Sequence, residues 1–127
     1  MSSQSTAGTG LTGLPETPPT QELEFFRCEV SRERDTAKVR PIGELDLATV
    51  PILSAQVAEL LKAGCRYLIF DLGELEFIDS TGLRFLLECY ADSRNDGFAI
   101  ALRPGPPAVQ QVFELTDTRS HLPFLDR

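Results

Sequence analysis

Hydrophobic and polar residues follow each other along this chain in patterns that predict a succession of strands and helices. Two short, partly alternating segments, Glu24–Val30 and Ala37–Ile42, flank the polar stretch Ser31–Thr36 and predict a β-hairpin. The continuous apolar run Tyr67–Phe70 is typical of a strand buried on both faces. Phe98–Leu102 predicts a further strand.

Three other segments carry apolar residues at helical spacing. The first begins near Pro51 and is followed by Gly64, and the third is opened by Pro106 and Pro107. For the second helix, Ser80 is the expected N-cap. The three apolar faces consist of Val50, Leu53, Val57, Leu60 and Leu61, then Leu83, Leu86, Leu87 and Tyr90, and finally Val109, Val112 and Phe113.

The order of these elements, with a last short strand expected at Leu122–Leu125, is ββαβαβαβ. This order predicts a single α/β domain, residues 21–127, with a mixed β-sheet and crossover helices. Residues 1–20 consist mainly of Ser, Thr, Gly and Pro and cannot bury enough apolar surface to offset the entropy of ordering. We therefore expect a disordered N-terminal tail.

Composition narrows the possible partners. A formal net charge of −7 over 127 residues disfavours phosphate backbones and anionic membranes, so we expect neither nucleic acid nor direct membrane binding. The chain has neither an apolar run of about 20 residues nor a signal-like start, which indicates a cytoplasmic protein. The three cysteines form no CxxC pair and His121 is the only histidine, so we expect no metal site and no cofactor.

Two loops that follow strands are the candidate sites. One runs through Asp71–Leu83 and the other through Gly43–Leu47, and both are expected at the same sheet edge. Ser80 would lie beside the free N–H groups of a helix start, where a phosphate is stabilised. From these residues alone, however, an ordinary N-cap is the favoured interpretation, because Ser caps helices in any protein. The expected edge lacks Lys and Arg, so it is either a solvated acidic rim or a docking face for a basic partner. Its acidic residues are Glu44, Asp46, Glu74, Glu76 and Asp79.

Catalytic interpretations fit less well. Ser80, Asp117 and His121 follow the chain order of an α/β-hydrolase triad, but Ile78 stands where the nucleophile elbow needs Gly. The sequence contains neither a GxxxxGK[ST] loop nor a GxGxxG fingerprint. Asp71 ends a strand as a receiver phosphoaspartate would, but the early acidic pair and the late lysine are missing. We therefore expect a protein that is not an enzyme.

Three stretches resemble the STAS domain of bacterial anti-sigma factor antagonists. They are Gly43-Glu44-Leu45-Asp46-Leu47, then Phe77-Ile78-Asp79-Ser80-Thr81-Gly82-Leu83, and finally the segment Pro106–Thr116, similar to the family's closing helix. The similarity covers roughly residues 22–127. It implies a partner-switching regulator that, when unphosphorylated, binds an anti-sigma factor with serine kinase activity and so releases the sigma factor.

By the same resemblance, Ser80 is the residue that the anti-sigma kinase phosphorylates and a serine phosphatase restores. Mg-ATP would belong to the kinase and not to this chain. Asp46 matches an aspartate that contributes to recognition or phosphorylation. The implied partner-binding residues are Glu44, Asp46, Asp79, Ser80, Thr81, Gly82 and Arg84.

Some positions depart from the family pattern. Asp117 stands where the family usually has Gly, and Pro123 would interrupt a regular last strand. Arg84, at an often small position, is expected in the first turn of the Ser80 helix, where it could pair with phosphate or alter partner choice. The alternative function is a STAS subunit of a membrane transport or lipid-transport assembly, which would need no phosphorylatable serine.

Overall fold

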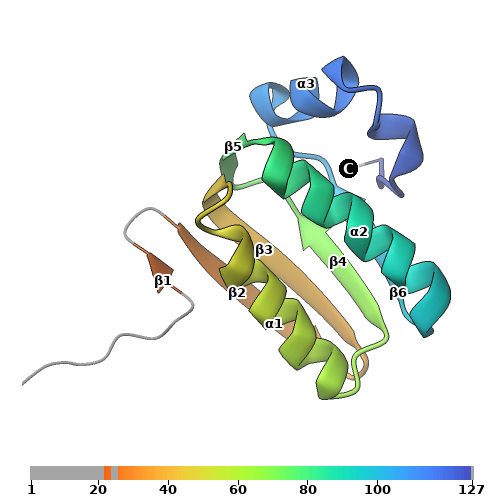
Figure 1. Ribbon diagram of the computed structural model, residues 1–127. Helices are drawn as coiled ribbons and strands as arrows, with labels where there is room; N and C mark the ends of the chain where they lie inside the picture. Colours follow the sequence, from red (N-terminus) through yellow and green to blue (C-terminus); the bar gives the residue numbers. More distant parts are fainter. Residues whose placement is uncertain (1–21, 24–25, 127) are drawn as a thin grey trace, which may run out of the picture.

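A computed structural model describes residues 22–23 and 26–126 of the chain (Figure 1). The expected tail, residues 1–20, lies outside the described residues, as does Arg127. The elements follow in the order β1, β2, β3, α1, β4, β5, α2, β6, α3 and a short 3₁₀ turn at Arg119–His121. The expected class, a single α/β domain, is confirmed.

The strands form one mixed sheet. They are β1 (Glu22–Leu23), β2 (Phe26–Glu33), β3 (Thr36–Leu45), β4 (Tyr67–Asp71), β5 (Leu75–Ile78) and β6 (Ala99–Arg103). Their order is β1-β2-β3-β4-β6, with β5 pairing beside the end of β3. The β2–β3 hairpin is antiparallel, whereas β3–β4, β4–β6 and β3–β5 are parallel. Parallel neighbours need crossover connections, and α1 and α2 provide them.

Strand β3 shows why the sheet has one covered face. Ala37, Val39 and Pro41 are buried, while the alternate residues Lys38 and Arg40 are only half-buried. Because side chains alternate with period two, one face of β3 packs into the core and the other stays accessible. The helices α1 (Val50–Lys62) and α2 (Ser80–Asp96) pack side by side on one face of the sheet (Figure 1).

Both of these helices present the apolar faces that their spacing predicted. Leu53 and Val57 of α1 and Leu83 and Leu86 of α2 are buried in the core. Gly97 ends α2 with a φ of +78°, a left-handed conformation that glycine adopts without steric cost. The third helix, α3 (Pro107–Leu115), buries Val109 and Phe113.

The expected order needs correction in three places, the first of which is the short strand β1 before the expected hairpin. Strand β5 lies within the segment that was expected to be a loop. Its pattern was hidden because the two middle residues of this four-residue strand, Glu76 and Phe77, are both exposed. The expectation of a regular strand at Leu122–Leu125 was wrong. The segment makes a single bridge, between Leu102 and Phe124. Pro123 has no N–H to donate, so it contributes only its carbonyl, which accepts from the Leu102 N–H.

Candidate functional site

The two candidate loops meet at the carboxyl ends of β3 and β5. Glu44 is the register partner of Phe77, and Leu45 that of Ile78. The Asp79 N–H donates to the Leu45 carbonyl oxygen at 3.1 Å, so the pairing runs to the start of α2. The expectation that both loops lie at one edge is therefore confirmed.

The N-cap of α2 is Asp79, so the assignment of the cap to Ser80 was wrong. Asp79 has an extended backbone, with φ −108° and ψ −174°, and its Oδ1 accepts from the Gly82 N–H at 3.0 Å. Aspartate and serine cap helices about equally well, so residue type alone could not choose between adjacent positions. Ser80 becomes the first residue of α2, and its side chain is exposed.

Gly82 sets how closely α2 approaches the sheet. A Cβ atom there would lie 2.8 Å from the Leu45 carbonyl oxygen and 2.9 Å from side-chain atoms of Ile78 and Leu45. Only glycine fits this contact. Gly82 is itself buried and cannot touch a partner. It would affect a partner-binding face only indirectly, because it allows the first turn of α2 to lie close to β3. Thr81 is half-buried beside it.

Arg84 is the fifth residue of α2 and is exposed, one residue beyond the first turn in which we expected it. Residues four apart on a helix share a face, so Arg84 lies on the same face of α2 as Ser80. The Arg84 guanidinium group is therefore a positive charge on the same face of α2 as the candidate phosphorylation site.

Asp46 organises the loop between β3 and α1. Its Oδ1 accepts from the backbone N–H groups of Ala48, at 3.0 Å, and of Thr49, at 3.2 Å. The Thr49 hydroxyl donates to the Glu44 carbonyl oxygen at 2.7 Å and accepts from the Asp46 N–H at 2.9 Å. Helix α1 itself has Thr49 at its N-cap position, with no side-chain cap bond. The Asp46 carboxylate thus holds the loop in a fixed conformation.

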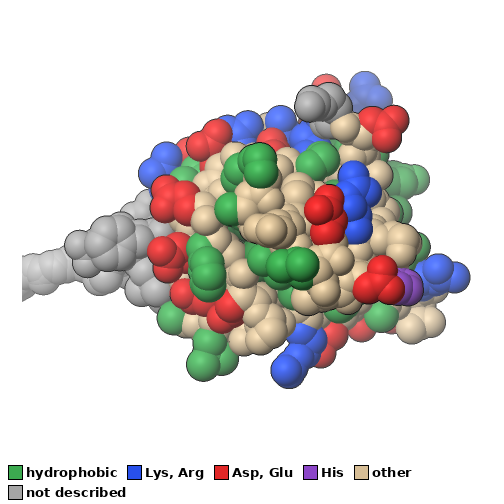
Figure 2. Space-filling model, turned by 90° about the horizontal axis from the view of Figure 1, so that it is seen from above, with side chains coloured by type: hydrophobic (Ala, Val, Ile, Leu, Met, Phe, Trp, Pro, Cys, Tyr) green, Lys and Arg blue, Asp and Glu red, His purple; other side chains and the backbone are tan. Residues whose placement is uncertain are grey.

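The surface around these residues is acidic and apolar. Glu44, Glu74 and Glu76 are exposed, and Asp46 and Asp79 are half-buried. Neither residues 41–61 nor residues 67–83 contain Lys or Arg. Figure 2, which views the molecule from the end where β5 and α3 lie, shows red and green side chains beside each other, with most blue ones toward the rim.

Two exposed hydrophobic residues lie within the same segments, and the sequence analysis missed both. Leu47 is 74% exposed and Phe77 is 47% exposed. Alternation along a strand would have placed Phe77 on the same face as the buried Leu75, two residues away. A register shift between Gly43 and Glu44 breaks that alternation, so the sequence pattern does not reveal the exposure of Phe77. Leu47 gives no signal either, because a single apolar residue in a loop belongs to no periodic pattern that would indicate its exposure.

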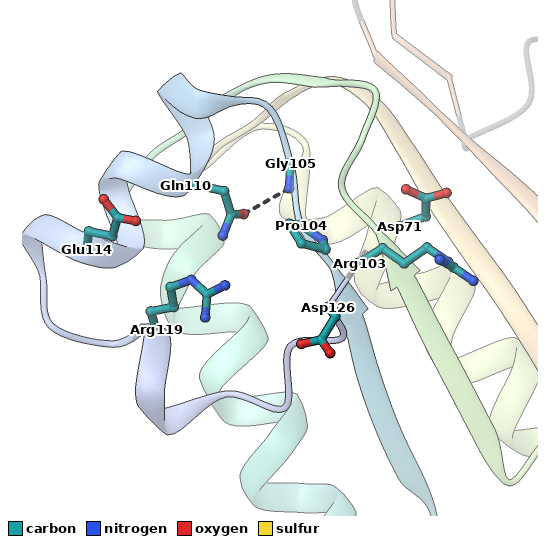
Figure 3. A pocket seen from close by; sticks show the side chains of 8 residues that line it. All are labelled: Asp71, Arg103, Pro104, Gly105, Gln110, Glu114, Arg119 and Asp126. Carbon is teal, nitrogen blue, oxygen red and sulfur yellow. Dashed lines mark hydrogen bonds between the residues drawn. The ribbon is translucent and has the colours of Figure 1, made fainter.

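A pocket lies between the ends of β4 and β6, α3 and the C-terminal segment (Figure 3). Gln110 is fixed there because its Oε1 accepts from the Gly105 N–H at 2.8 Å. None of the residues proposed for the site lines this pocket. Its residues are Asp71, Arg103, Pro104, Gly105, Gln110, Glu114, Arg119 and Asp126. This pocket is therefore separate from the candidate site at Ser80.

The geometry also bears on the other sequence candidates. The His121 ring contacts the Asp117 carbonyl oxygen at 3.0 Å, so this ring nitrogen meets main chain and not the carboxylate that a catalytic triad uses. Asp117 adopts a φ of +58°, in the left-handed region that glycine adopts without steric cost. Within the described ranges, no helix has the length and apolar character to cross a membrane.

All three cysteines are free thiols. Cys65 and Cys89 are buried, and Cys28 is half-buried. Burial, with a smaller effect of Glu29, raises the pKa of Cys28 to about 11. Burial, assisted by Asp92 and Glu88, raises the pKa of Cys89 to about 12. At neutral pH these two groups are protonated, and thiols in that state are poor nucleophiles.

The chain is a small α/β domain with a mixed sheet and two helices on one face. It carries an exposed serine at the start of α2. Comparison with known families agrees: a family model described as "Mlab, STAS domain" matches residues 28–122. The chain belongs to the STAS-domain family and, within it, is related to anti-sigma factor antagonists.

Two relatives and one solved fold illustrate this relation. The anti-sigma F factor antagonist of Paenibacillus polymyxa is 27% identical over 102 residues, 80% of this chain and 87% of the relative. BtrV of Bordetella bronchiseptica, a candidate anti-sigma factor antagonist, is 32% identical over 81 residues, 64% of this chain and 70% of BtrV.

The anti-sigma factor antagonist SpoIIAA has the same fold. Its unphosphorylated form is 24% identical with a TM-score of 0.65, covering 80% of this chain and 87% of that structure. The phosphorylated form, from Bacillus, is 22% identical with a TM-score of 0.61, covering 80% of this chain and 90% of that structure. At this level of identity the similarity concerns the fold.

Proposed function

We propose that this chain is an anti-sigma factor antagonist that works by partner switching. In its unphosphorylated form it binds an anti-sigma factor with serine kinase activity and thereby releases a sigma factor. Phosphorylation of Ser80 ends the binding, and a serine phosphatase restores it. The observation that carries the proposal is Ser80 itself: it is exposed at the start of α2, while the neighbouring Asp79 performs the capping.

The relatives support the same function. Two of them are named for antagonism of anti-sigma factors, and one related fold, SpoIIAA, is described in both an unphosphorylated and a phosphorylated form. In this chain the serine that follows the capping aspartate is the residue whose side chain a kinase could reach. The chain contributes no catalytic group in this proposal, and Mg-ATP is held by the partner kinase in the cytoplasm.

The fold should tolerate the phosphate. A phosphoserine adds about −1.5 to −2 charges at neutral pH. At the first position of α2 this charge meets free backbone N–H groups and the positive end of the helix dipole. Arg84, on the same face of α2, offers a cation to the phosphate.

The complex with the partner should not tolerate it. In the complex, the phosphate would join the carboxylates of Asp46, Asp79 and Glu44 at one edge. Burying an additional charge against like charges costs several kcal/mol when it lacks a partner. A loss of about 1.4 kcal/mol already weakens binding tenfold, so release needs no large conformational change.

The test uses the full chain and the purified serine-kinase anti-sigma factor of the same organism. Wild type, Ser80→Ala and Ser80→Asp are incubated with the kinase and Mg-ATP, phosphate is mapped by mass spectrometry, and binding is titrated. We expect Ser80→Ala to bind constitutively without phosphate and Ser80→Asp to bind at least tenfold more weakly. Ser54→Ala, which changes an exposed serine in the middle of α1, is the matched control and should behave like wild type.

Phosphate on Thr81, or undiminished binding once Ser80 is modified, would contradict the proposal. An affinity pull-down with the unphosphorylated chain separates it from the transport alternative. Co-purification of a permease or a transport ATPase, with the same yield from Ser80→Asp as from wild type, would favour a subunit of a transport or lipid-transport assembly.

A further inference from the structure

The face at the ends of β3 and β5 carries two exposed hydrophobic side chains that the packing of the domain does not use. Leu47 is 74% exposed and Phe77 is 47% exposed, although their neighbours Leu45 and Ile78 are buried almost completely. Side chains alternate along a strand, so Phe77 and its register partner Glu44 point away from the core. Exposed apolar side chains grouped at one edge are typical of a surface that binds another protein.

These two residues are close to the switch in the fold. Phe77 precedes Ser80 by three residues, and Leu47 follows Glu44, the register partner of Phe77, by three residues. Both segments end at the same edge, where the Asp79 N–H meets the Leu45 carbonyl oxygen. Leu47, Phe77 and Ser80 therefore lie on segments that meet at the same end of the sheet.

Leu47 is presented by a loop that is already ordered. The Asp46 carboxylate accepts from the N–H groups on the far side of Leu47, those of Ala48 and Thr49, and the Thr49 hydroxyl ties the loop to Glu44. Binding through a preorganised loop loses less conformational entropy than binding through a mobile one. This favours Leu47 as a contact residue over an incidental exposed side chain.

The charges around the two residues indicate the chemistry of the partner. Glu44, Glu74 and Glu76 are exposed within the same two segments, which contain no Lys or Arg. Protein interfaces combine an apolar centre with a polar rim, and opposite charges across the rim set the orientation and the association rate. The complementary surface is therefore an apolar depression with Lys and Arg opposite Glu44, Glu74 and Glu76 and no cation opposite Ser80.

We propose that Leu47 and Phe77 are the apolar anchors of the capture surface, and that they insert into an apolar, basic-rimmed depression on the anti-sigma partner. This inference rests on the proposed function and adds to it which residues carry affinity. Ser80 sets whether the complex forms, whereas the anchors set how tightly the unphosphorylated chain is held. Interfaces concentrate their binding energy in a few residues, and aromatic side chains such as Phe77 are enriched at their centres.

Alanine variants of the anchors test the inference. Leu47→Ala and Phe77→Ala are titrated, in the full chain, against the purified serine-kinase anti-sigma factor without ATP, and the kinase reaction on each is followed with Mg-ATP. We expect each variant to bind about tenfold more weakly, which corresponds to about 1.4 kcal/mol. In the kinase reaction the loss should appear as a raised KM at unchanged kcat, because Ser80 itself is intact.

The chain offers matched controls for both side chains. Tyr67 is an aromatic residue that is 52% exposed, but it lies at the first residue of β4, beside Thr36 and so at the opposite end of β3 from the site. Leu115 is a leucine that is 79% exposed at the end of α3. Tyr67→Ala and Leu115→Ala should change the affinity less than twofold. Thermal melts of all four variants check that the fold is kept.

The contribution of the acidic residues to partner binding can be measured separately. Glu44→Gln and Glu76→Gln should lower the association rate and weaken its dependence on salt, since screening acts on the attraction that these residues provide. Equal affinity of wild type, Leu47→Ala and Phe77→Ala, with Ser80→Asp still unable to bind, would overturn the anchors and leave the proposed function standing. Failure of the unmodified chain to bind the kinase at all would overturn both.

Discussion

Gly82 lies so close to Leu45 that a Cβ atom at position 82 would come within 2.8 Å of the Leu45 carbonyl oxygen. This contact joins the first turn of α2 to the end of β3. It therefore places the exposed Ser80 next to the loop that carries Asp46 and Leu47. The glycine of the Asp-Ser-Thr-Gly stretch is a packing residue, and its effect on binding passes through the position of the helix.

Gly82→Ala should destabilise the domain and displace the start of α2. Overpacking of this kind typically costs about 1–3 kcal/mol, because backbone atoms, unlike a flexible side chain, cannot move aside. Urea unfolding measures the loss. Gly73→Ala is the control, since its Cβ would meet only the Asp71 Oδ1 at 3.1 Å. Equal stability of both variants would show that α2 can shift without cost.

The cap of α2 gives a second prediction. Asp79→Ala removes the acceptor for the Gly82 N–H and should cost about 1 kcal/mol, whereas Asp79→Asn retains a capping oxygen and should unfold close to wild type. The free energy of unfolding from urea titration distinguishes them. Ser80→Ala should leave it unchanged, and a loss there equal to that of Asp79→Ala would mean that Ser80 is the cap after all.

For Asp46, charge and hydrogen bonding can be separated. Asp46→Asn keeps a side-chain oxygen for the N–H groups of Ala48 and Thr49 but removes the charge. We expect an unchanged melting temperature together with weaker capture or slower phosphorylation of Ser80. Calorimetry and a kinase assay measure the two quantities. Asp46→Ala, which loses both bonds, should also lower the melting temperature. Binding and phosphorylation of Asp46→Asn equal to wild type would return Asp46 to a purely structural role.

The cysteines predict how stability depends on pH in alkaline solution. Burial raises the pKa of Cys28 to about 11 and of Cys89 to about 12, above the ordinary value of 9.0 that the unfolded chain has. The folded state thus favours the protonated thiols. Their contribution to stability is complete below pH 9 and is lost as the pH rises from 9 toward 11–12.

Urea unfolding at pH 8 and pH 10.5 measures this loss. A Cys28→Ala, Cys89→Ala double variant should show a smaller decrease between the two pH values. At pH 7.5 the native thiols should also react slowly with iodoacetamide, compared with the urea-unfolded chain. Rapid alkylation of the native protein would show that the thiols are accessible and ionised.

Periodicity predicted the elements that are long and packed on one side. The hairpin, α1, α2 and β4 follow from apolar residues that recur at the spacing of their secondary structure, because burial imposes that spacing. Strand β5 was missed, since four residues with two exposed in the middle carry too little pattern. The cap at Asp79 was missed for a different reason: Asp and Ser are equivalent caps, and only the backbone conformation of each residue distinguishes them.

At the site, the sequence predicted the two loops and their common edge, but not the anchors. Exposure of Leu47 depends on how the Asp46 carboxylate turns the loop, which is a three-dimensional property. The structure of the C-terminal segment Leu122–Leu125 was also predicted only in part. Pro123 indicated that a regular strand was unfavourable, and the structure shows a single bridge between Leu102 and Phe124, with the Phe124 ring packed edge-on against Phe113 at a centroid distance of 5.0 Å.

Because Asp79 and not Ser80 closes the end of α2, the hydroxyl that we propose is modified contributes nothing to holding the domain together. A phosphate there meets free N–H groups and the positive end of the helix dipole, so the modification does not raise the fraction of unfolded chains or the exposure to cellular proteases. The phosphorylated form would therefore not be degraded faster than the unmodified one. Capture could be switched off without loss of the chains, which a phosphatase could later return to use.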